Sequence, residues 1–299
     1  MIQKIKTIGT TYSQMQSLLD GLERSYDSCQ HLAQCTPHDR KSIERRFGEV
    51  KSTPDKTISM KKGSPSPKTF HFKQFSVSAG ECGMPVSTDG VLLGAWMNGE
   101  HLRSILDIGT GTGLLALFCA QRFPTAQITA LDIDQQAIQT AIHNRDHSPW
   151  ASRIKIEHQD ILTFAPRSDY DAIICNPPYF TSGQTSVVPE RALARHVSGF
   201  SHQQLLHHCY HLLSPSGQLS MILPCQEGDA LIEVAKQQGW FLTRYCLVSP
   251  TDTKPPARVL FSLSKTAPSA CEFTQLTIRA QNSYTSAFTE LTRAFYLKM

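Results

Sequence analysis

Leu-Asp-Ile-Gly-Thr-Gly-Thr-Gly, at residues 106–113, is the stretch of sequence that decides the fold. It ends an apolar, strand-like segment, Ser104–Ile108, and opens a helix-like segment at residues 113–122. Glycines at alternate positions allow backbone angles and a close ligand approach that a Cβ atom would prevent. In open α/β sheets, ligands bind at the carboxyl ends of the strands, where this turn lies. The turn therefore predicts an α/β fold with a ligand site; the alternative is a tight strand–helix turn without one.

Strand-like and helix-like segments alternate along the rest of the chain. The other predicted strands are Gln127–Asp132, Ile154–His158, Tyr170–Cys175, Gln218–Leu223, Phe241–Val248 and Arg258–Leu263. The helices are predicted near residues 113–122, 135–147, 201–213 and 227–238. This alternation predicts parallel βαβ units, with helices on both faces of a mostly parallel sheet. A proline-rich turn joins the last two strands and is compatible with an antiparallel hairpin at the sheet edge.

Further elements are predicted before and after this sheet. Phe70–Val77 alternates as a strand, and Thr88 or Asp89 can cap a helix that ends at Trp96. Leu276–Ile278 is a candidate strand, and Thr285–Leu297 has the pattern of an amphipathic helix.

Aspartates stand at or after the ends of the first strands. Asp107 leads the glycines Gly109, Gly111 and Gly113, and this arrangement suits a ligand with an ammonium group, such as the methionine end of S-adenosylmethionine. Asp132 ends the next strand and can accept hydrogen bonds from the ribose hydroxyls of an adenosyl cofactor. The alternative is that Asp132 or Asp134 only caps the following helix.

A third acidic position follows the third strand. Asp160 can accept from the adenine amine of the cofactor, while Ile133 and Ile161 enclose the ring. A helix-capping or turn-capping role for Asp160 is the alternative. Together these positions predict an adenosyl cofactor across three strand ends.

The strongest motif is Asn-Pro-Pro-Tyr at residues 176–179, directly after the fourth strand. Pro177 and Pro178 fix two φ angles and remove two N–H donors, which leaves a stiff backbone that offers carbonyl acceptors. The Asn176 oxygen and the Pro177 carbonyl can accept both N–H groups of an exocyclic amine and direct its lone pair. Tyr179 offers a stacking face for a base. The motif therefore predicts methylation of a planar nitrogen, with catalysis by alignment.

These two motifs together are typical of class I methyltransferases that act on planar nitrogens. Residues 70–299 resemble, more specifically, the bacterial tRNA1(Val) adenine-N6 methyltransferases. The resemblance is carried by residues 72–75, 87–96, 107–117, 148–150, 176–179, 258–260 and 294–297. It implies a Rossmann-like class I fold with a seven-stranded, mostly parallel sheet, an N-terminal β-hairpin and a C-terminal helix. It also implies that S-adenosylmethionine is the cofactor and that N6 of adenine 37, next to the anticodon, is the target.

The resemblance places particular residues at the site. It implies that Thr88 and Asp89 lie beside the cofactor and that Asn176 and Pro177 hold the target amine. The sequence departs from the family at Ser87, where glycine is usual, and residues 1–59 have no recognised counterpart. Neither departure touches the predicted chemistry.

Candidate contacts with the RNA are four basic residues, and their alternative is an ordinary solvated charge: Lys73, Arg191, Arg195 and Arg258. Arg191 and Arg195 are four residues apart and can share a helical face. His207 and His211 have a spacing that metals use, but no carboxylate completes a ligand set. No metal is predicted.

Composition restricts the class of protein further. Nine cysteines without a C-x-x-C pair argue against disulfides and zinc ribbons. No apolar run approaches the roughly 20 residues of a membrane span. Residues 1–67 hold 11 Lys and Arg against 7 Asp and Glu, whereas the remaining residues hold 18 of each. We therefore expect a monomeric, cytoplasmic protein whose RNA contacts are local.

The domain boundary is predicted near residue 67, with an extension at 1–67 and a methyltransferase domain at 68–299. Met15, Leu18, Leu19, Leu22 and Tyr26 form one helical stripe in the extension. Two interpretations remain open: this helix docks, dimerises or stays poorly ordered, or the natural start is Met60 and the upstream segment is not in the mature protein.

Three other functions remain as alternatives. A release-factor glutamine methyltransferase uses the same motif, but it usually carries a separate helical domain first. An rRNA or DNA adenine methyltransferase is a second candidate, and DNA enzymes generally need a sizeable recognition domain. A non-catalytic RNA-binding relative is the third, although both motifs are intact here.

Overall fold

The computed structural model describes residues 68–80, 86–166, 168–177 and 202–298. The chain divides into two units, Met1–Gly63 and Ser64–Met299, and all the described residues belong to the second unit. The predictions for residues 1–67 and for Pro178, Tyr179, Arg191 and Arg195 therefore lie outside the described residues, and the domain boundary stays a prediction.

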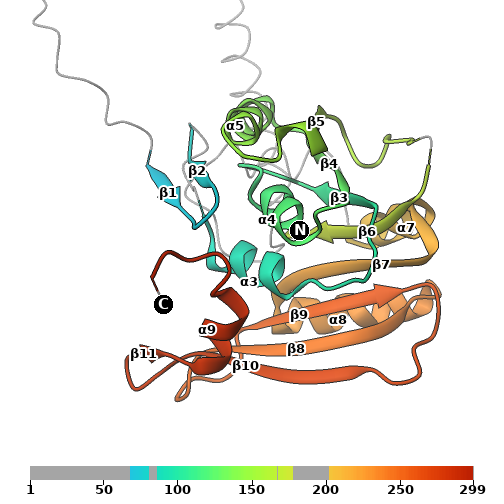
Figure 1. Cartoon of the computed structure of the whole chain (residues 1–299). Coiled ribbons are helices and arrows are strands. Elements are labelled where there is room, and N and C mark those ends of the chain that lie inside the picture. Colours follow the sequence, from blue (N-terminus) through green and yellow to red (C-terminus); the bar gives the residue numbers. More distant parts are fainter. Residues whose placement is uncertain (1–67, 81–85, 167, 178–201, 299) are drawn as a thin grey trace, which may run out of the picture. The chain divides into compact units, whose positions relative to one another are not determined.

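A nine-stranded sheet in the order β11-β10-β8-β9-β7-β6-β3-β4-β5 forms the centre of the described unit (Figure 1). Its strands are β3 (Ser104–Ile108), β4 (Gln127–Asp132), β5 (Ile154–His158), β6 (Tyr170–Cys175), β7 (Leu213–Pro224), β8 (Phe241–Thr251), β9 (Arg258–Ser264), β10 (Glu272–Ala280) and β11 (Ser283–Tyr284). Strands β5, β4, β3, β6 and β7 pair in parallel, and β9 runs antiparallel between β7 and β8. The carboxyl ends of the five parallel strands therefore meet at one edge.

Helices cover both faces of this sheet, with α4 in front of it and α8 behind it in Figure 1. The helices are α3 (Thr88–Trp96), α4 (Leu114–Arg122), α5 (Gln135–Asp146), α7 (His202–Leu212), α8 (Cys225–Gln237) and α9 (Ser286–Thr292). Successive residues of a strand point to opposite faces. Ile105 accordingly joins the core under α3, α4 and α9, whereas Leu106 joins the core under α7 and α8. The central strands β3, β6 and β9 are thus buried on both faces, as the strands of parallel sheets are.

The predicted α/β architecture is confirmed, and the structure extends it. All seven predicted strands are present, and β3, β4, β5 and β6 have the predicted bounds. The candidate strand at Leu276–Ile278 is confirmed as the longer β10, which pairs in parallel with β8 and is followed by β11. The proline-rich turn does join an antiparallel pair, β8 and β9. That pair does not include the outermost strand of the sheet, because β10 and β11 lie outside β8.

Local predictions near the termini needed correction. The single strand predicted at Phe70–Val77 is a hairpin of β1 (Thr69–His71) and β2 (Ser76–Ser78), because residues 73–75 form its turn. Helix α3 ends at Trp96 as predicted, but its N-cap is Ser87, whose side chain accepts a hydrogen bond from the Gly90 N–H. The last helix, α9, ends at Thr292 rather than at Leu297.

An aromatic cluster holds the hairpin against the C-terminal segment. Phe72 pairs with Tyr296 through a β-bridge, and its ring stacks on Phe75 at 4.7 Å. Phe118 of α4 stacks on Phe295 at 4.1 Å and meets Phe72 edge-on at 5.3 Å. Such ring pairs contribute about 0.5–1.5 kcal/mol each beyond the burial of their area. Phe72, Phe75, Phe295 and Tyr296 therefore serve packing.

Asn144 joins the hairpin to the glycine turn, which the sequence did not indicate. It is buried in α5, where its amide accepts from the Ser78 N–H at 2.9 Å. The same amide donates to the Ser78 carbonyl at 3.0 Å and to the Thr112 carbonyl at 2.8 Å. The sequence does not indicate these hydrogen bonds, because Asn144 binds backbone groups of Ser78 and Thr112, which are distant from it in the chain.

Candidate active site

The glycine turn is open on its outer side. Gly109, Gly111 and Gly113 have φ angles of +70°, +56° and +82°, a region that side chains with a Cβ rarely adopt. A Cβ atom built on Gly109 or Gly111 meets no atom within 4 Å, so the space beside these two residues is available to a ligand. Gly113 is different because its Cβ position lies 3.4 Å from Ala141 of α5 and its backbone caps α4. Two glycines thus face the site and the third serves packing.

Asp107 lies underneath this turn and is completely buried. Its Oδ2 accepts from the Thr110 hydroxyl at 2.6 Å and from the Ala116 N–H at 3.1 Å. Its Oδ1 is buried and has no partner among the described residues. Burial raises the pKa of this carboxyl from 3.8 to about 7, although both hydrogen bonds oppose the shift. Asp107 therefore holds the turn in shape and places a titrating charge beneath it.

Asp132, at the end of β4, closes the turn from the side. Its Oδ2 accepts from the Gly111 N–H at 2.8 Å, and its Oδ1 accepts from the Asp134 N–H at 3.0 Å. Asp134 in turn caps α5, since its side chain accepts from the Gln136 N–H. The two aspartates thus have separate positions: Asp134 is the cap, and Asp132 stands against the glycine turn.

The loop after β5 lies beside Asp132. The Gln159 N–H donates to the Asp132 carbonyl at 3.0 Å. Asp160 accepts from the Leu162 N–H at 2.9 Å, which is the turn-capping interaction considered above as its alternative. Ile161 is buried, whereas Ile133 is 58% exposed. An exposed isoleucine between two acidic loops provides an apolar surface for a flat ring.

The register of the central strands brings Asn176 next to the glycine turn. Ile108, the last residue of β3, pairs with Cys175, the last residue of β6. The residues that follow, Gly109 and Asn176, therefore leave neighbouring strands that lie roughly 4.8 Å apart. Asn176 is half-buried and Pro177 is buried. Leu131 pairs with Ile108 from the other side, so Asp132 also leaves the sheet at this level.

Asp89 and Arg258 meet at the same edge. The Arg258 Nε lies 2.9 Å from Asp89 Oδ2, in an ion pair that links α3 to the start of β9. Arg258 reaches this edge because β9 runs antiparallel to β7 and pairs there with Pro224. The sequence indicated Asp89 for the cofactor and Arg258 for the RNA, but it gave no sign that they bind each other. Thr88 is the first residue of α3 and stands next to Asp89.

Among the described residues, the remaining predicted positions have contacts of their own elsewhere. The ammonium of Lys73 donates to the Arg293 carbonyl at 2.5 Å, next to the aromatic cluster of the hairpin. His207 and His211 contact each other on α7 with ring centroids 4.7 Å apart. Within the described ranges, no group of three or more metal-binding side chains was found. Over the same residues, no helix is both long and apolar enough to cross a membrane.

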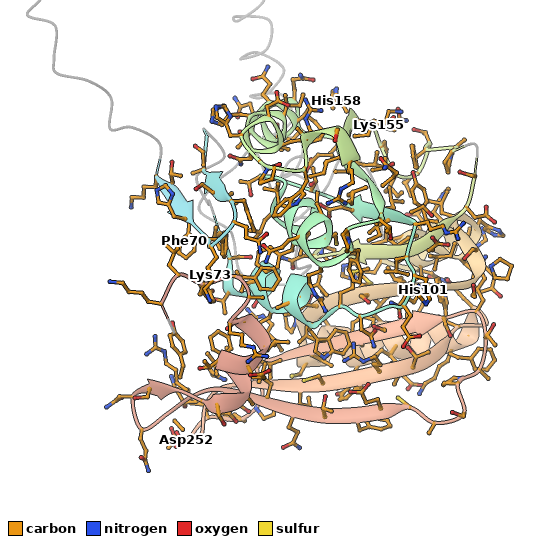
Figure 2. The ribbon with its side chains drawn as sticks, in the orientation of Figure 1. Phe70, Lys73, His101, Lys155, His158 and Asp252 are labelled. Carbon is orange, nitrogen blue, oxygen red and sulfur yellow. The ribbon has the colours of Figure 1, made fainter. Side chains whose placement is uncertain are left out.

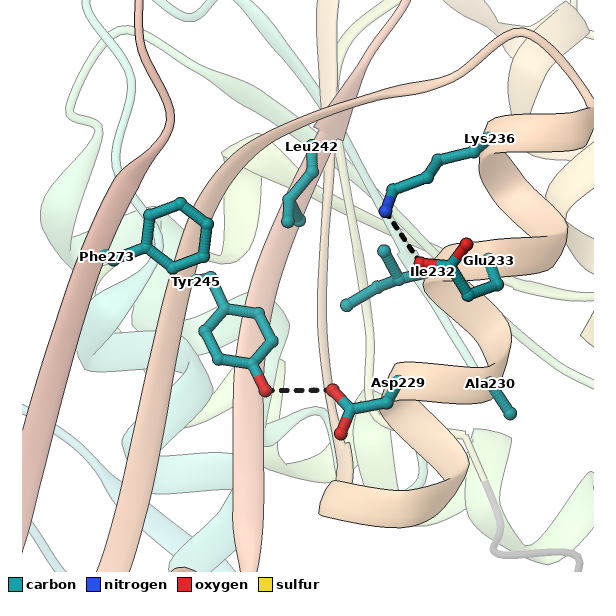
Figure 3. A pocket seen from close by; sticks show the side chains of 8 residues that line it. All are labelled: Asp229, Ala230, Ile232, Glu233, Lys236, Leu242, Tyr245 and Phe273. Atoms are coloured by element: carbon teal, nitrogen blue, oxygen red, sulfur yellow. Dashed lines mark hydrogen bonds and ion pairs between the residues drawn. The ribbon is translucent and has the colours of Figure 1, made fainter.

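A separate surface pocket of about 430 Å³ lies between α8 and the strands β8 and β10 (Figure 3). Its polar side chains are already paired: Tyr245 donates to Asp229 at 2.8 Å, and Lys236 donates to Glu233 at 2.6 Å. None of the predicted site residues lines it. We therefore assign the chemistry to the glycine turn and not to this pocket.

Comparison with known proteins identifies the class to which the chain belongs. A family model described as "Methyltransferase small domain" matches residues 88–228, which include the glycine turn and Asn176. A solved structure from Agrobacterium tumefaciens, described as a predicted O-methyltransferase, superposes with a TM-score of 0.53 at 20% identity. It covers 69% of this chain and 96% of that chain, and at this identity it shows the fold alone. Fold and family model together define a Rossmann-like, S-adenosylmethionine-dependent methyltransferase.

Curated relatives define the family more narrowly. A protein of Vibrio parahaemolyticus named tRNA1(Val) (adenine(37)-N6)-methyltransferase is 50% identical over 240 residues, which cover 80% of this chain and all of that protein. A protein of the same name from Vibrio cholerae is 54% identical over 78% of this chain and 96% of its own length. The chain belongs to the family of tRNA1(Val) (adenine(37)-N6)-methyltransferases.

Proposed function

We propose that this chain transfers a methyl group from S-adenosylmethionine to N6 of adenine 37 in tRNA1(Val). The observation that carries the proposal is the register of β3 and β6, which brings Asn176 next to the open glycine turn. A nitrogen held at Asn176 and a methyl donor held on the turn would then be neighbours. The names of the curated relatives support the substrate.

The residues at the turn fit the cofactor. S-adenosylmethionine, when bound, supplies an electrophilic methyl carbon on a sulfonium. The space beside Gly109 and Gly111 receives its methionine part, with the charge of Asp107 below. Asp132 accepts the ribose hydroxyls, which requires sharing its oxygens with the two backbone N–H groups they already hold. Exposed Ile133 covers the adenine, and Asp160 and Ile161 border it.

Asn176 and Pro177 position the target amine. The Asn176 side-chain oxygen accepts one N–H of the adenine amine and the Pro177 carbonyl accepts the other, so that the nitrogen lone pair points at the methyl carbon. The nitrogen–carbon bond would form as the carbon–sulfur bond broke, which would leave the sulfur as a neutral thioether, and the methylated amine would then lose one proton to solvent water. Pro178 keeps the backbone rigid and Tyr179 stacks on the base. Correct alignment can supply about 7–11 kcal/mol of the barrier in favourable cases.

The buried carboxyl of Asp107 makes cofactor binding dependent on pH. Its pKa is raised to about 7, so it gains its negative charge between pH 6 and pH 8. An ammonium group above it binds the charged form better, and we expect affinity about tenfold weaker at pH 6 than at pH 8 for one such proton. In the ligand-free protein the sign is opposite: Asp107 contributes its full stability below pH 4 and loses it as pH rises through 7.

Isothermal calorimetry at pH 6, 7 and 8 measures the cofactor dissociation constant, and thermal unfolding of the ligand-free protein measures the stability. Asp107→Asn is the matched control, because it keeps the shape without the titration and should show a flat profile in both measurements. A wild-type affinity that follows the same flat profile would contradict the role of Asp107.

A methyl-transfer assay with the full chain tests the proposed function directly. The substrates are labelled S-adenosylmethionine with tRNA1(Val), with the same tRNA carrying guanine at position 37, with rRNA, with DNA, and with a release factor. We expect label in the first tRNA only, recovered as N6-methyladenosine after digestion to nucleosides. Label in release factor, rRNA or DNA instead would establish one of the alternatives, and cofactor binding without any transfer would indicate a non-catalytic relative. The proposal includes a monomeric enzyme in the cytoplasm, where tRNA is modified.

A further inference from the structure

The site lies at the end of the sheet where the parallel strands have their carboxyl ends. This end of the sheet has a second half. The cofactor residues follow β3, β4 and β5, and Asn176 follows β6, so they occupy one half of the strand order. The other half consists of β7, β9, β8 and β10. Because β8 and β10 pair in parallel and β8 is antiparallel to β9, both end at the edge where β9 begins. The loops after β8 and β10 are thus on the same side as Asn176.

These two loops lie against each other. Thr251, the last residue of β8, pairs with Arg279 of β10, and the Asp252 N–H donates to the Arg279 carbonyl at 3.0 Å. Figure 2 shows Asp252 at this end of the sheet, on the opposite side of the view from His101, which lies in the loop before β3. The β8–β9 loop (residues 252–257) and the β10–β11 hairpin (residues 279–284) therefore form one continuous surface, named here the outer edge surface.

The outer edge surface has a net charge of +1. It carries exposed Lys254 and Arg279 against one acid, Asp252. Arg258 borders it, although its guanidinium is held by Asp89. Gln281 and Asn282 have φ angles of +48° and +65°, which close a tight hairpin turn between β10 and β11.

A stacked cation and ring stand at the tip of the hairpin. The Arg279 guanidinium lies 4.2 Å from the centroid of the Tyr284 ring, and Tyr284 is 44% exposed. Tyr284 also stacks on buried Phe288 at 4.9 Å, which fixes its orientation. Arg279 and Phe288 thus cover the two faces of the Tyr284 ring, and the outer face of the planar Arg279 guanidinium is the surface on which an unpaired RNA base can stack. Lys254 and Arg279 can contact phosphates, which determine how a nucleic acid is positioned.

The chemistry of this surface favours RNA over a protein partner. Among the large exposed hydrophobic side chains of the described residues, only Tyr284 lies on it; the others are Ile133, Phe241, Phe273 and Leu297. A stable protein interface needs an apolar centre, which a single tyrosine does not supply. Positive charge with one fixed ring instead matches a phosphate backbone with an unstacked base.

We propose that the outer edge surface binds the backbone and a loop base of the substrate RNA, with Arg279, Tyr284 and Lys254 as the contacting residues. This inference rests on the proposed function for the identity of the RNA. The cofactor residues and Asn176 then handle the reacting groups, while the outer edge surface holds the nucleotides that flank the target adenine. Each of the two cations contributes to the salt dependence of binding, at roughly one unit of the slope of log Kd against log salt.

Two variants of the full-length protein test this inference: Arg279→Ala combined with Tyr284→Ala, and Lys254→Ala. Arg103→Ala is the matched control, because Arg103 is exposed and lies directly before β3, at the amino-terminal ends of the parallel strands. Binding of the anticodon stem–loop is measured by fluorescence anisotropy over a range of salt concentrations, and methyl transfer is measured separately. We expect the double variant to bind RNA about 5- to 150-fold more weakly, as the loss of about 1–3 kcal/mol of stacking implies. The salt slope should fall by about one unit, with kcat at saturating RNA and cofactor affinity unchanged.

The two proposals fail in different ways in this experiment. If the wild type methylates the RNA but the variants bind it as tightly as Arg103→Ala does, the outer edge surface does not bind the RNA. The proposed function then stands. If RNA binding is lost in the variants but the wild type transfers no methyl group, the surface stands and the proposed function is wrong. An equal loss in all three variants would indicate general electrostatic attraction and would overturn the assignment. Unchanged cofactor affinity identifies variants that are correctly folded.

Discussion

Asn176→Ala is expected to lower kcat for methyl transfer by about 10²–10³-fold, which is the loss typical when one positioned hydrogen-bonding group is removed from a reacting centre. The dissociation constant of S-adenosylmethionine should stay nearly unchanged, because Asn176 follows β6 whereas the cofactor residues follow β3, β4 and β5. The physical reason is orientation: without the side-chain acceptor, the amine rotates and its lone pair no longer points at the methyl carbon. Single-turnover kinetics with saturating tRNA, together with calorimetry for the cofactor, measure the two effects.

Asn176→Asp is the matched control for this variant. It keeps an oxygen acceptor in the same place and should retain more activity than Asn176→Ala, whereas Asn176→Leu keeps the size without the acceptor and should be as inactive as alanine. Equal activity of the leucine variant and the wild type would contradict the role assigned to the amide oxygen. A parallel loss of cofactor affinity in all three variants would instead indicate that the turn itself is disturbed.

Asp132→Ala is expected to weaken cofactor binding by about 10²–10⁴-fold, because two charge-assisted hydrogen bonds to the ribose would be lost, at about 1.5–3 kcal/mol each. The variant also loses the acceptor that holds the Gly111 N–H at 2.8 Å, so the glycine turn becomes less well fixed. Affinity for tRNA should change little, since Asp132 lies on the β4 side of the turn, away from Asn176. Calorimetry with the cofactor and anisotropy with tRNA measure the two affinities.

Asp134→Ala separates this effect from helix capping. Asp134 is two residues away and caps α5, so its loss should cost about 1 kcal/mol of stability without a comparable change in cofactor affinity. If Asp134→Ala weakens cofactor binding as much as Asp132→Ala does, the contribution of Asp132 is structural and the ribose assignment is wrong. The ribose assignment would equally be wrong if Asp132→Ala lost affinity for tRNA and kept its affinity for the cofactor.

Much of the sheet could be predicted because its strands are buried on both faces. Apolar runs in β3 and β6, and apolar residues at alternate positions in β4 and β5, predicted the bounds of these four strands from the sequence. Strand β10 was recognised only in part, since most of its residues are exposed and carry no apolar pattern. The segment Phe70–Val77 was predicted as one strand because the turn residues Lys73 and Gln74 do not include a glycine or proline, whereas the N-terminal β-hairpin that the family resemblance implied is confirmed.

The positions of the site residues were also predictable, but their partners were not. Asp107, Asp132 and Asn176 stand at strand ends, and parallel strands bring their ends together whatever the loops contain. By contrast, the hydrogen bond that the Gly111 N–H donates to Asp132 joins residues 21 positions apart. The ion pair between Asp89 and Arg258 joins residues 169 positions apart. No local pattern encodes such pairs, because they depend on how far each strand extends and on which side its loop turns.

The sequence by itself determined the α/β class, the glycine turn and the Asn-Pro-Pro-Tyr motif, since these depend on local backbone preferences and on the period of apolar residues. Only the tertiary structure decided that β10 and β11 extend the sheet beyond β8, that Arg258 is held by Asp89, and that Arg279 and Tyr284 share the edge of Asn176. The physical reason is that strand order and register are set by long-range pairing and packing, which bring together residues that no short stretch of sequence relates.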